Sequence, residues 1–300
     1  MRKLLKYTPL AAILAVVVVI IWSETFVSTK ILIGEGLSPA EIFVCRFILA
    51  YILCWIFCPG RLFSDSLTDE FKLVLLGLTG GSLYFWTENT ALAYSTASNV
   101  GILVCSAPII TAMIMSVFYK EERMDPRQIL GSVIAFCGVA LVVMNGQFIL
   151  KLNPIGDALA VGAALTWGFY SLIIKGLSGK YNISFITRKI FAYGILTMLP
   201  FFIATHQDNL ESLIFSKPVI WSSLAYLGVV ASFGCFVIWN WCLKKLGTVR
   251  TTNIIYCQPF FTMIFAALIL GERVSWMAVA GTAVLVAGMF LMSSKSFKNT

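Results

Sequence analysis

The chain carries an internal repeat that runs through its apolar stretches, because residues 22–140 recur loosely, but in order, in residues 167–290. The matching landmarks keep an offset of 145 to 151 residues and include Trp22 with Trp167, Lys30 with Lys175, Asn89 with Asn240, and Pro108 with Pro259. Two similar halves in one membrane protein are typical of transporters, because alternating access to one site needs two nearly equivalent halves. The repeat predicts two units, at residues 1–146 and 147–300.

The composition is that of a protein embedded in a lipid bilayer. Hydrophobic residues make up 59% of the chain and charged residues 12%, whereas a soluble domain carries about a quarter charged residues. The net charge is +8, but the basic residues are scattered between apolar runs, which argues against a nucleic-acid partner. The eight cysteines form no C-x-x-C pair and His206 is the single histidine, so we expect no metal site, disulfide framework or cofactor.

Ten apolar runs approach the length of about 20 residues that crosses a bilayer as a helix. They lie at residues 9–31, 40–58, 72–93, 97–119, 127–145, 155–175, 185–204, 219–243, 250–270 and 275–293. Each half then holds five spans, and because five is odd, the second half enters the membrane from the opposite face. We therefore predict an all-α membrane protein with ten transmembrane helices arranged as two inverted five-helix repeats.

Basic residues in the short connections predict the orientation of these spans, because Lys and Arg concentrate on the cytoplasmic side. With the N-terminus in the cytoplasm, seventeen of these residues fall inside and four outside, while Arg46 lies within the second span. Both termini are then cytoplasmic. The first apolar run follows a basic segment but ends in no small-residue cleavage site, so we expect it to be retained as a span.

A set of motifs in fixed order accompanies the repeat. They are Trp22, Lys30, Arg46-Phe47, Ala91–Ser98, Pro108 and Glu122-Arg123 in the first half, and Trp167, Lys175, Gly247–Arg250, Pro259–Phe261 and Gly271–Arg273 in the second. With these motifs the chain resembles the ten-span EamA-type permeases of the drug/metabolite transporter superfamily. The resemblance implies a multi-pass protein of the bacterial plasma membrane that exports amino acids or other small metabolites, driven by gradients rather than ATP. The chain departs from the family pattern at Ser23-Glu24 and at Glu88, which puts an acid in the third span.

Four charged residues of the first three spans form the predicted chemical centre. Glu24, Arg46 and Glu88 lie about 8–10 Å below the outer ends of their spans at the helical rise per residue, and Lys30 lies near the rim. A charge near the bilayer centre costs ~2.5–3.5 kcal/mol, so it persists where it is paired or functional. One interpretation is a layer that binds substrate or a proton, with Glu24 or Glu88 titrating. The alternative is a buried Glu24–Arg46 ion pair that only joins two helices.

Aromatic and amide side chains complete the predicted binding site. Together with the charges, its residues are Trp22, Glu24, Lys30, Arg46, Tyr84, Glu88, Asn89, Trp167, Tyr170, Lys175, Trp239, Asn240 and Gln258. Tyr84 and Glu88 are four residues apart and are expected to share one helix face. Aromatic walls with a few polar groups suit a zwitterionic or aromatic metabolite. The alternative is that the Trp and Tyr residues lie at the lipid interface.

Proline and paired charges mark further positions that recur in both halves. Pro108 and Pro259 interrupt the fourth and ninth spans, where a missing backbone donor predicts a helix kink, either beside the binding site or purely structural. Glu122-Arg123 and Glu272-Arg273 stand at loop edges, where helix capping and orientation explain them, with gating as the alternative.

The features together predict a secondary-active transporter, an exporter of a small metabolite such as an amino acid or a drug-like compound. The expected partners are this small-molecule substrate, the lipid bilayer and, as a candidate coupled ion, a proton. A channel-like facilitator is the alternative that the inverted repeat also fits. A membrane-embedded enzyme is disfavoured, because the sequence contains no H-E-x-x-H motif and no phosphate-binding loop.

Overall fold

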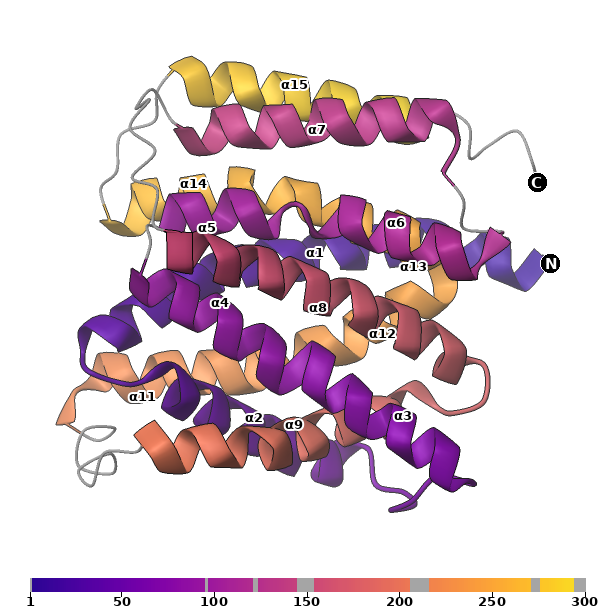
Figure 1. The fold of residues 1–300 in the computed structure, drawn as a ribbon, viewed down its shortest axis with the longest axis vertical. Helices are drawn as coiled ribbons and strands as arrows, with labels where there is room; N and C mark the ends of the chain where they lie inside the picture. Colours follow the sequence, from indigo (N-terminus) through magenta and orange to yellow (C-terminus); the bar gives the residue numbers. More distant parts are fainter. Residues whose placement is uncertain are drawn as a thin grey trace.

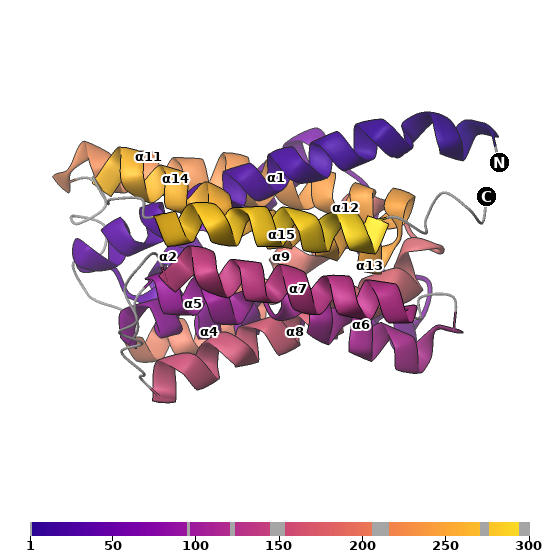
Figure 2. The same ribbon diagram turned by 90° about the horizontal axis from the view of Figure 1, so that it is seen from above.

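The computed structural model describes residues 2–94, 97–120, 124–144, 154–205, 216–270 and 276–293, and the regular structure in these ranges is helical. The helices run side by side in two opposite directions, so that the connections gather at two ends of one bundle (Figures 1 and 2). We call the end where α1 begins and α15 finishes the terminal end. The opposite end, where α1 finishes at Gly34, is the distal end.

The helices group into ten spanning units within the described ranges. The first half contains α1 (Arg2–Gly34), α2 (Pro39–Phe57), α3 (Leu67–Gly77) continued by η1 (Leu78–Ser82) and α4 (Leu83–Tyr94), α5 (Ala97–Val104) with α6 (Ala107–Phe118), and α7 (Pro126–Met144). The second half contains α8 (Pro154–Ser178), α9 (Ile183–Thr205), α11 (Pro218–Ala225) continued by η3 (Tyr226–Gly234) and α12 (Cys235–Leu246), α13 (Thr248–Asn253) with η4 (Ile254–Cys257) and α14 (Gln258–Leu270), and α15 (Trp276–Ser293). The predicted all-α, ten-span layout is confirmed.

Equivalent units of the two halves run in opposite directions. Helix α1 starts at the terminal end, whereas α8, its counterpart in the repeat, starts at the distal end and finishes at the terminal end (Figure 1). Five uninterrupted stretches are long and apolar enough to cross a membrane by themselves: Pro9–Gly34, Pro39–Phe57, Pro154–Ser178, Ile183–Ala204 and Pro218–Leu246. The third unit, Leu67–Tyr94, is continuous as well, and α7 has 19 residues, as many as α2.

Interruptions occur at matching places in both halves. The π-helical segments η1 and η3 lie in the third and eighth units, and their starts are separated by the offset found in the sequence. The expected kinks are breaks: Pro108 stands in the first turn of α6 after α5 has ended, and Pro259 in the first turn of α14 after η4. Proline fits a first turn because the backbone N–H it lacks has no helical partner there.

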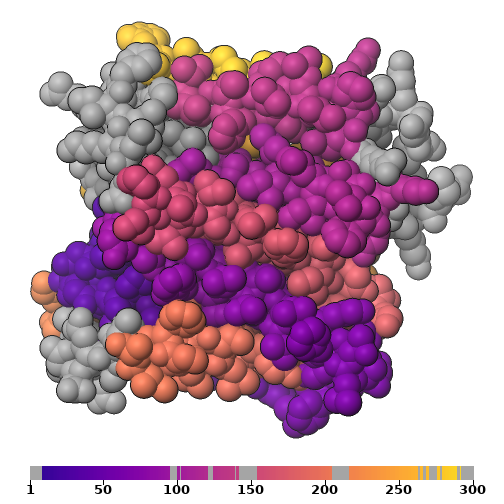
Figure 3. All heavy atoms as spheres, in the orientation of Figure 1, coloured from indigo at the N-terminus to yellow at the C-terminus, as the bar shows by residue number. Residues whose placement is uncertain are grey.

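Helices α7 and α15, the last units of the two halves, pack against each other as a layer on one side of the bundle (Figure 3). Two glycines allow this approach. A Cβ atom on Gly138 would lie 2.3 Å from the backbone nitrogen of Leu285, and one on Gly288 would lie 2.4 Å from that of Ala135. The small residues therefore set the distance between the two helices, as is usual for close helix pairs in membranes.

We expect Gly138→Ala to lower the free energy of unfolding by about 1–3 kcal/mol, because the added methyl group meets backbone that cannot move aside. The measurement is thermal or denaturant unfolding of the purified protein in detergent. Gly162→Ala in α8 is the matched control, since its Cβ would find Thr87 Cγ2 at 3.9 Å, an ordinary contact, and alanine favours the helix. Equal destabilisation by the two changes would show that helix contact at Gly138 is not the cause.

Three expectations fall on residues outside the described ranges. The predicted boundary between residues 146 and 147 lies there, as do the paired charges Glu122-Arg123 and Glu272-Arg273. They remain predictions from the sequence.

Candidate functional site

A cavity lies between the two halves of the chain. Its lining residues come from both halves and are Trp22, Thr25, Phe26, Arg46, Tyr84, Phe85, Glu88, Val104, Ala107, Trp167, Phe236, Ile255 and Gln258. Six residues of the predicted site meet here, namely Trp22, Arg46, Tyr84, Glu88, Trp167 and Gln258. The breaks at Pro108 and Pro259 also lie beside the cavity, because Ala107, Ile255 and Gln258 line it.

Packed aromatic rings close the cavity toward the terminal end. The ring centroid of Trp22 lies 5.6 Å from that of Trp167, 5.9 Å from Phe236 and 5.0 Å from Trp239. Trp239 follows Phe236 toward the terminal end of α12, and Tyr170 follows Trp167 in the same direction along α8. Both of these deeper side chains are completely buried. We call these five residues the aromatic floor.

Arg46 is a buried cation that lines the cavity. Its side chain is 2% exposed, and its Nε donates a hydrogen bond to Ser232 Oγ at 2.8 Å. The guanidinium carbon lies 4.5 Å from the ring centroid of Phe85. In the described part of the chain no carboxylate forms an ion pair with it. The alternative of a Glu24–Arg46 ion pair is therefore wrong.

Glu88 lines the same cavity from α4. It is 8% exposed, and the Tyr84 hydroxyl donates a hydrogen bond to its Oε1 at 2.8 Å. The prediction that these two residues share one helix face is confirmed. Arg46 and Glu88 thus present opposite charges to one cavity without forming an ion pair with each other. A ligand that carries both charges could bind between them.

Glu24 and Lys30 lie outside the lining of the cavity. Glu24 is half-buried on α1, and its Oε1 accepts a hydrogen bond from Ser28 Oγ at 2.6 Å. Its Oε2 is buried and accepts no hydrogen bond of regular geometry among the described residues, and the nearby Tyr226 hydroxyl donates to the carbonyl oxygen of Ile21 at 3.0 Å. Ser28 lies one turn along the same helix, and Glu24 forms no ion pair with Arg46 in the described ranges. Lys30 is exposed near the distal end of α1.

Several predicted site residues hold helices together instead of lining the cavity. Asn240 accepts a hydrogen bond from the Tyr170 hydroxyl and donates one to Thr187 Oγ1 at 2.9 Å. Asn89 Nδ2 is 3.5 Å from the carbonyl oxygen of Pro39 at the start of α2. Each amide therefore forms its hydrogen bonds with groups on other helices. The prediction that Asn89 and Asn240 line the binding site is therefore not met by the cavity, because their side chains contact neighbouring helices instead.

The remaining predicted residues lie on the terminal side of the cavity. The amine of Lys175 lies 4.2 Å from the ring centroid of Tyr119, near the end of α8. Trp239 belongs to the aromatic floor, and its buried Nε1 finds no hydrogen-bond acceptor in the described ranges. The same is true of Nε1 of Trp167, which does line the cavity. The latter is a buried donor at the cavity wall.

The π-helical segment η3 contributes contacts that the sequence did not reveal. Its Ser232 accepts the hydrogen bond from Arg46, and the carbonyl oxygen of Ala231 accepts one from Trp22 Nε1 at 3.0 Å. Segments of this kind are frequent at functional sites. In the sequence, η1 and η3 are related only by the repeat offset. This offset does not predict that Ser232 contacts Arg46 or that Phe85 and Phe236 line the cavity.

Comparison with known proteins gives the fold and the family. The model of the EamA-like transporter family matches residues 9–144 and 154–294. An "uncharacterized transporter" of Archaeoglobus fulgidus is 28% identical over 94% of this chain and 97% of its own length. A "probable terminal-alkyne amino-acid exporter" of Streptantibioticus cattleyicolor is 25% identical over 94% of this chain and 92% of its own.

Two further similarities cover nearly the whole chain. A "probable amino-acid metabolite efflux pump" of Escherichia coli is 24% identical over 93% of both chains. A solved crystal structure superposes with a TM-score of 0.77 at 15% identity, over 95% of this chain and 96% of that one, which shows a common fold. The family match covers both halves of the repeat. The chain therefore belongs to the EamA-like transporter family and is a multi-pass membrane transporter.

Proposed function

We propose that the chain is a secondary-active exporter of zwitterionic, amino-acid-like metabolites and that the central cavity is its binding site. The observation that carries the proposal is Arg46, a buried cation that forms no ion pair among the described residues and that lines one cavity with Glu88. The printed names of the relatives from Streptantibioticus cattleyicolor and Escherichia coli support an amino-acid-like substrate and outward transport.

In this proposal, Arg46 binds the carboxylate of the substrate. A guanidinium can donate two parallel hydrogen bonds to a carboxylate, and such charged pairs are among the strongest hydrogen bonds in proteins. Ser232 and Phe85 hold the guanidinium from two sides, so little side-chain freedom is lost when a ligand binds. Nε1 of Trp167, which has no acceptor among the described residues, supplies a further donor at the cavity wall.

The two acids are assigned different roles. Glu88 lines the cavity and is the partner of the substrate's ammonium group. Glu24 lies outside the lining, is half-buried, and has one carboxylate oxygen that accepts no hydrogen bond of regular geometry in the described ranges, so we assign it the coupled proton. Intramembrane acids commonly serve as proton relays in pumps and transporters. Inward movement of a proton would then drive outward movement of the substrate.

The orientation follows from the basic residues of the connections, which favour a cytoplasmic terminal end. The bacterial plasma membrane is the location that the family match and this charge distribution support. The aromatic floor lies between the cavity and the terminal end, so the structure corresponds to a state closed toward the cytoplasm. Such a floor also argues against a channel, since a channel needs a continuous path.

The test is a flux experiment with purified protein in proteoliposomes. Amino acids with different side chains are compared with their amides, which lack the carboxylate, and with the matching 2-oxo acids, which lack the ammonium group. We expect saturable flux and counterflow for the zwitterions, and stimulation by a pH gradient. Equal rates for zwitterion, amide and 2-oxo acid, or flux that does not saturate, would contradict the proposal.

A further inference from the structure

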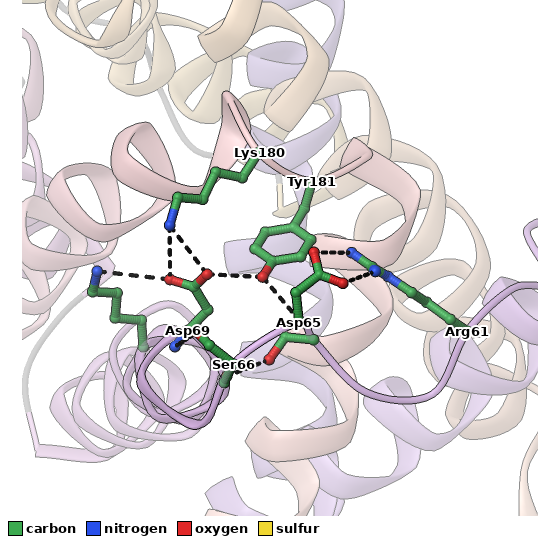
Figure 4. A network of polar contacts seen from close by, with 8 residues as sticks. Arg61, Asp65, Ser66, Asp69, Lys180 and Tyr181 are labelled. Atoms are coloured by element: carbon green, nitrogen blue, oxygen red, sulfur yellow. Dashed lines mark hydrogen bonds and ion pairs between the residues drawn. The ribbon is translucent and has the colours of Figure 1, made fainter.

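A network of polar contacts joins the two halves at the terminal end (Figure 4). Asp69, near the start of α3, is 4% exposed. Its Oδ2 accepts a hydrogen bond from the Tyr181 hydroxyl at 2.8 Å and one from Lys180 Nζ at 3.2 Å. The Tyr181 hydroxyl also accepts a hydrogen bond from the backbone nitrogen of Asp65 at 3.2 Å. Asp69 and Asp65 belong to the first half, Lys180 and Tyr181 to the second.

The neighbouring residue of α3 makes a second set of contacts between the halves. Glu70 Oε1 accepts hydrogen bonds from Lys189 Nζ and from the Tyr193 hydroxyl, both on α9. Its Oε2 accepts one from the backbone nitrogen of Ser64 at 2.7 Å. Lys189 is 7% exposed, so this ion pair is largely removed from water.

Arg188 extends the network to the connection between α2 and α3. Its Nη1 donates to the carbonyl oxygen of Cys58 at 2.8 Å, and its Nη2 donates to that of Arg61. The guanidinium carbon lies 4.2 Å from the ring centroid of Trp55. We call the residues whose side chains make these contacts between halves the terminal latch: Asp69, Glu70, Lys180, Tyr181, Arg188, Lys189 and Tyr193.

The distal end carries the symmetry counterpart of this latch with its charges reversed. The ion pair there joins Glu35, after α1, to Lys217, before α11. The repeat offset of 145 to 151 residues relates Glu35 to Lys180 and Lys217 to Asp69. The distal pair has side chains that are 26% and 58% exposed. A single exposed pair contributes little. The terminal latch also contains an exposed cation, Lys180, but it adds the buried side chains of Asp69, Tyr181, Arg188 and Lys189 to one connected network.

We propose that these contacts are opposing latches: the terminal latch holds the cytoplasmic side closed, and the weaker Glu35–Lys217 pair holds the distal side. Rocking of two inverted halves around a fixed site separates the halves at one end while it joins them at the other. Contacts between the halves that gather at one end, unlike those that run along the α7–α15 pair, are the ones that break when that end opens. The inequality of the two latches makes closure at the terminal end the resting state. The inference rests on the proposed function only in assuming alternating access.

The test measures distances between spin labels in the substrate-free protein in lipid nanodiscs. The eight native cysteines are replaced, and labels are attached at Leu67→Cys and Gly179→Cys at the terminal end. Leu67 is 90% exposed, and a Cβ on Gly179 meets no atom within 4 Å, so both positions tolerate a label. A second pair, Gly34→Cys and Trp221→Cys, reports the distal end, because Gly34 is equally free of neighbours and Trp221 is 50% exposed.

We expect one main distance at the terminal end in the parent protein. Two variants are expected to populate a second, longer distance: the double variant Asp69→Asn/Tyr181→Phe and the single variant Glu70→Gln. In each, the population of the longer distance relative to the shorter one should rise by about tenfold, because charged hydrogen bonds between the halves are lost. The distal pair of labels is expected to report shorter distances in the same variants. In Lys217→Gln, the labels at the terminal end are expected to report no additional, longer distance.

Asp65→Asn is the matched control. It removes a carboxylate at the same end, but the side chain of Asp65 pairs with Arg61 in its own half, and both are exposed. The backbone contact of Asp65 with Tyr181 remains. An unchanged distance in both latch variants, with a thermal transition that shows a folded protein, overturns the proposal. So does an equal shift with Asp65→Asn. Because no substrate is present, absence of flux for every compound leaves this result standing and rejects the proposed function alone.

Discussion

Replacement of Arg46 with glutamine is expected to lower the transport efficiency, kcat/KM, for a zwitterionic substrate by about 100-fold or more. Loss of one partner of a buried, hydrogen-bonded charge pair costs roughly 2–5 kcal/mol, and each 1.4 kcal/mol is about tenfold. In the proposed complex the substrate carboxylate would lose its guanidinium and remain buried. The measurement is the initial rate of uptake into proteoliposomes over a range of substrate concentrations.

Two controls separate this effect from misfolding. Arg46 has no carboxylate partner among the described residues, so the neutral glutamine should leave thermal stability unchanged or raised, because a buried, unpaired charge is removed. The substrate amide, which lacks the carboxylate, should be transported equally poorly by both proteins. Arg46→Lys keeps the charge but loses the forked geometry, so its efficiency should lie between the two. An efficiency of Arg46→Gln close to that of the parent protein would remove Arg46 from the binding site.

Glu88→Gln is expected to produce a comparable loss, about 100-fold, confined to substrates with an ammonium group. Glutamine still offers an oxygen to the Tyr84 hydroxyl, which donates to Glu88 Oε1 at 2.8 Å, so the local structure should persist. The 2-oxo acid, which has no ammonium group, should show little difference between the two proteins. Uptake of both compounds into proteoliposomes is the measurement.

The variant Glu24→Gln distinguishes the role proposed for Glu24 from that proposed for Glu88. Glu24 does not line the cavity, so the apparent substrate affinity without a pH gradient should stay near that of the parent protein, while stimulation by the gradient should be lost. An unchanged gradient response in Glu24→Gln would reject its assignment as proton carrier. A loss of affinity in Glu24→Gln equal to that in Glu88→Gln would reject the division of roles.

Patterns along the chain predicted the architecture well because they are local. Apolar runs identified the ten units, and the repeated landmarks gave the two halves whose counterparts α1 and α8 run in opposite directions. The spacing of Tyr84 and Glu88 gave a shared helix face for the same reason. Helical periodicity fixes which residues of one helix lie together, without reference to any other helix.

The contacts between units could not be predicted in this way. Depth along a span does not tell which neighbour a side chain meets, so Asn240 was expected in the cavity but bonds Tyr170 and Thr187. Ser232 carries no pattern of its own, and its role depends on Arg46, which lies 186 residues away in the sequence. The terminal latch follows no sequence pattern, because Asp69 and Glu70 on α3 meet Lys180 and Lys189, more than 100 residues away, only in the folded chain.

The inverted arrangement of the halves is the claim on which the carrier mechanism depends, and labelling of two equivalent residues tests it most directly. Gly34 ends the first unit, and Gly179 directly follows Ser178, the last residue of the sixth. The two glycines are related by the repeat offset and have no atoms within 4 Å of an added Cβ. Single variants Gly34→Cys and Gly179→Cys, each made without the native cysteines, are exposed to a membrane-impermeant maleimide in intact cells. Reaction of Gly34→Cys in intact cells, and of Gly179→Cys only after the cells are permeabilised, is the predicted result; reaction of both from the same side would contradict the account.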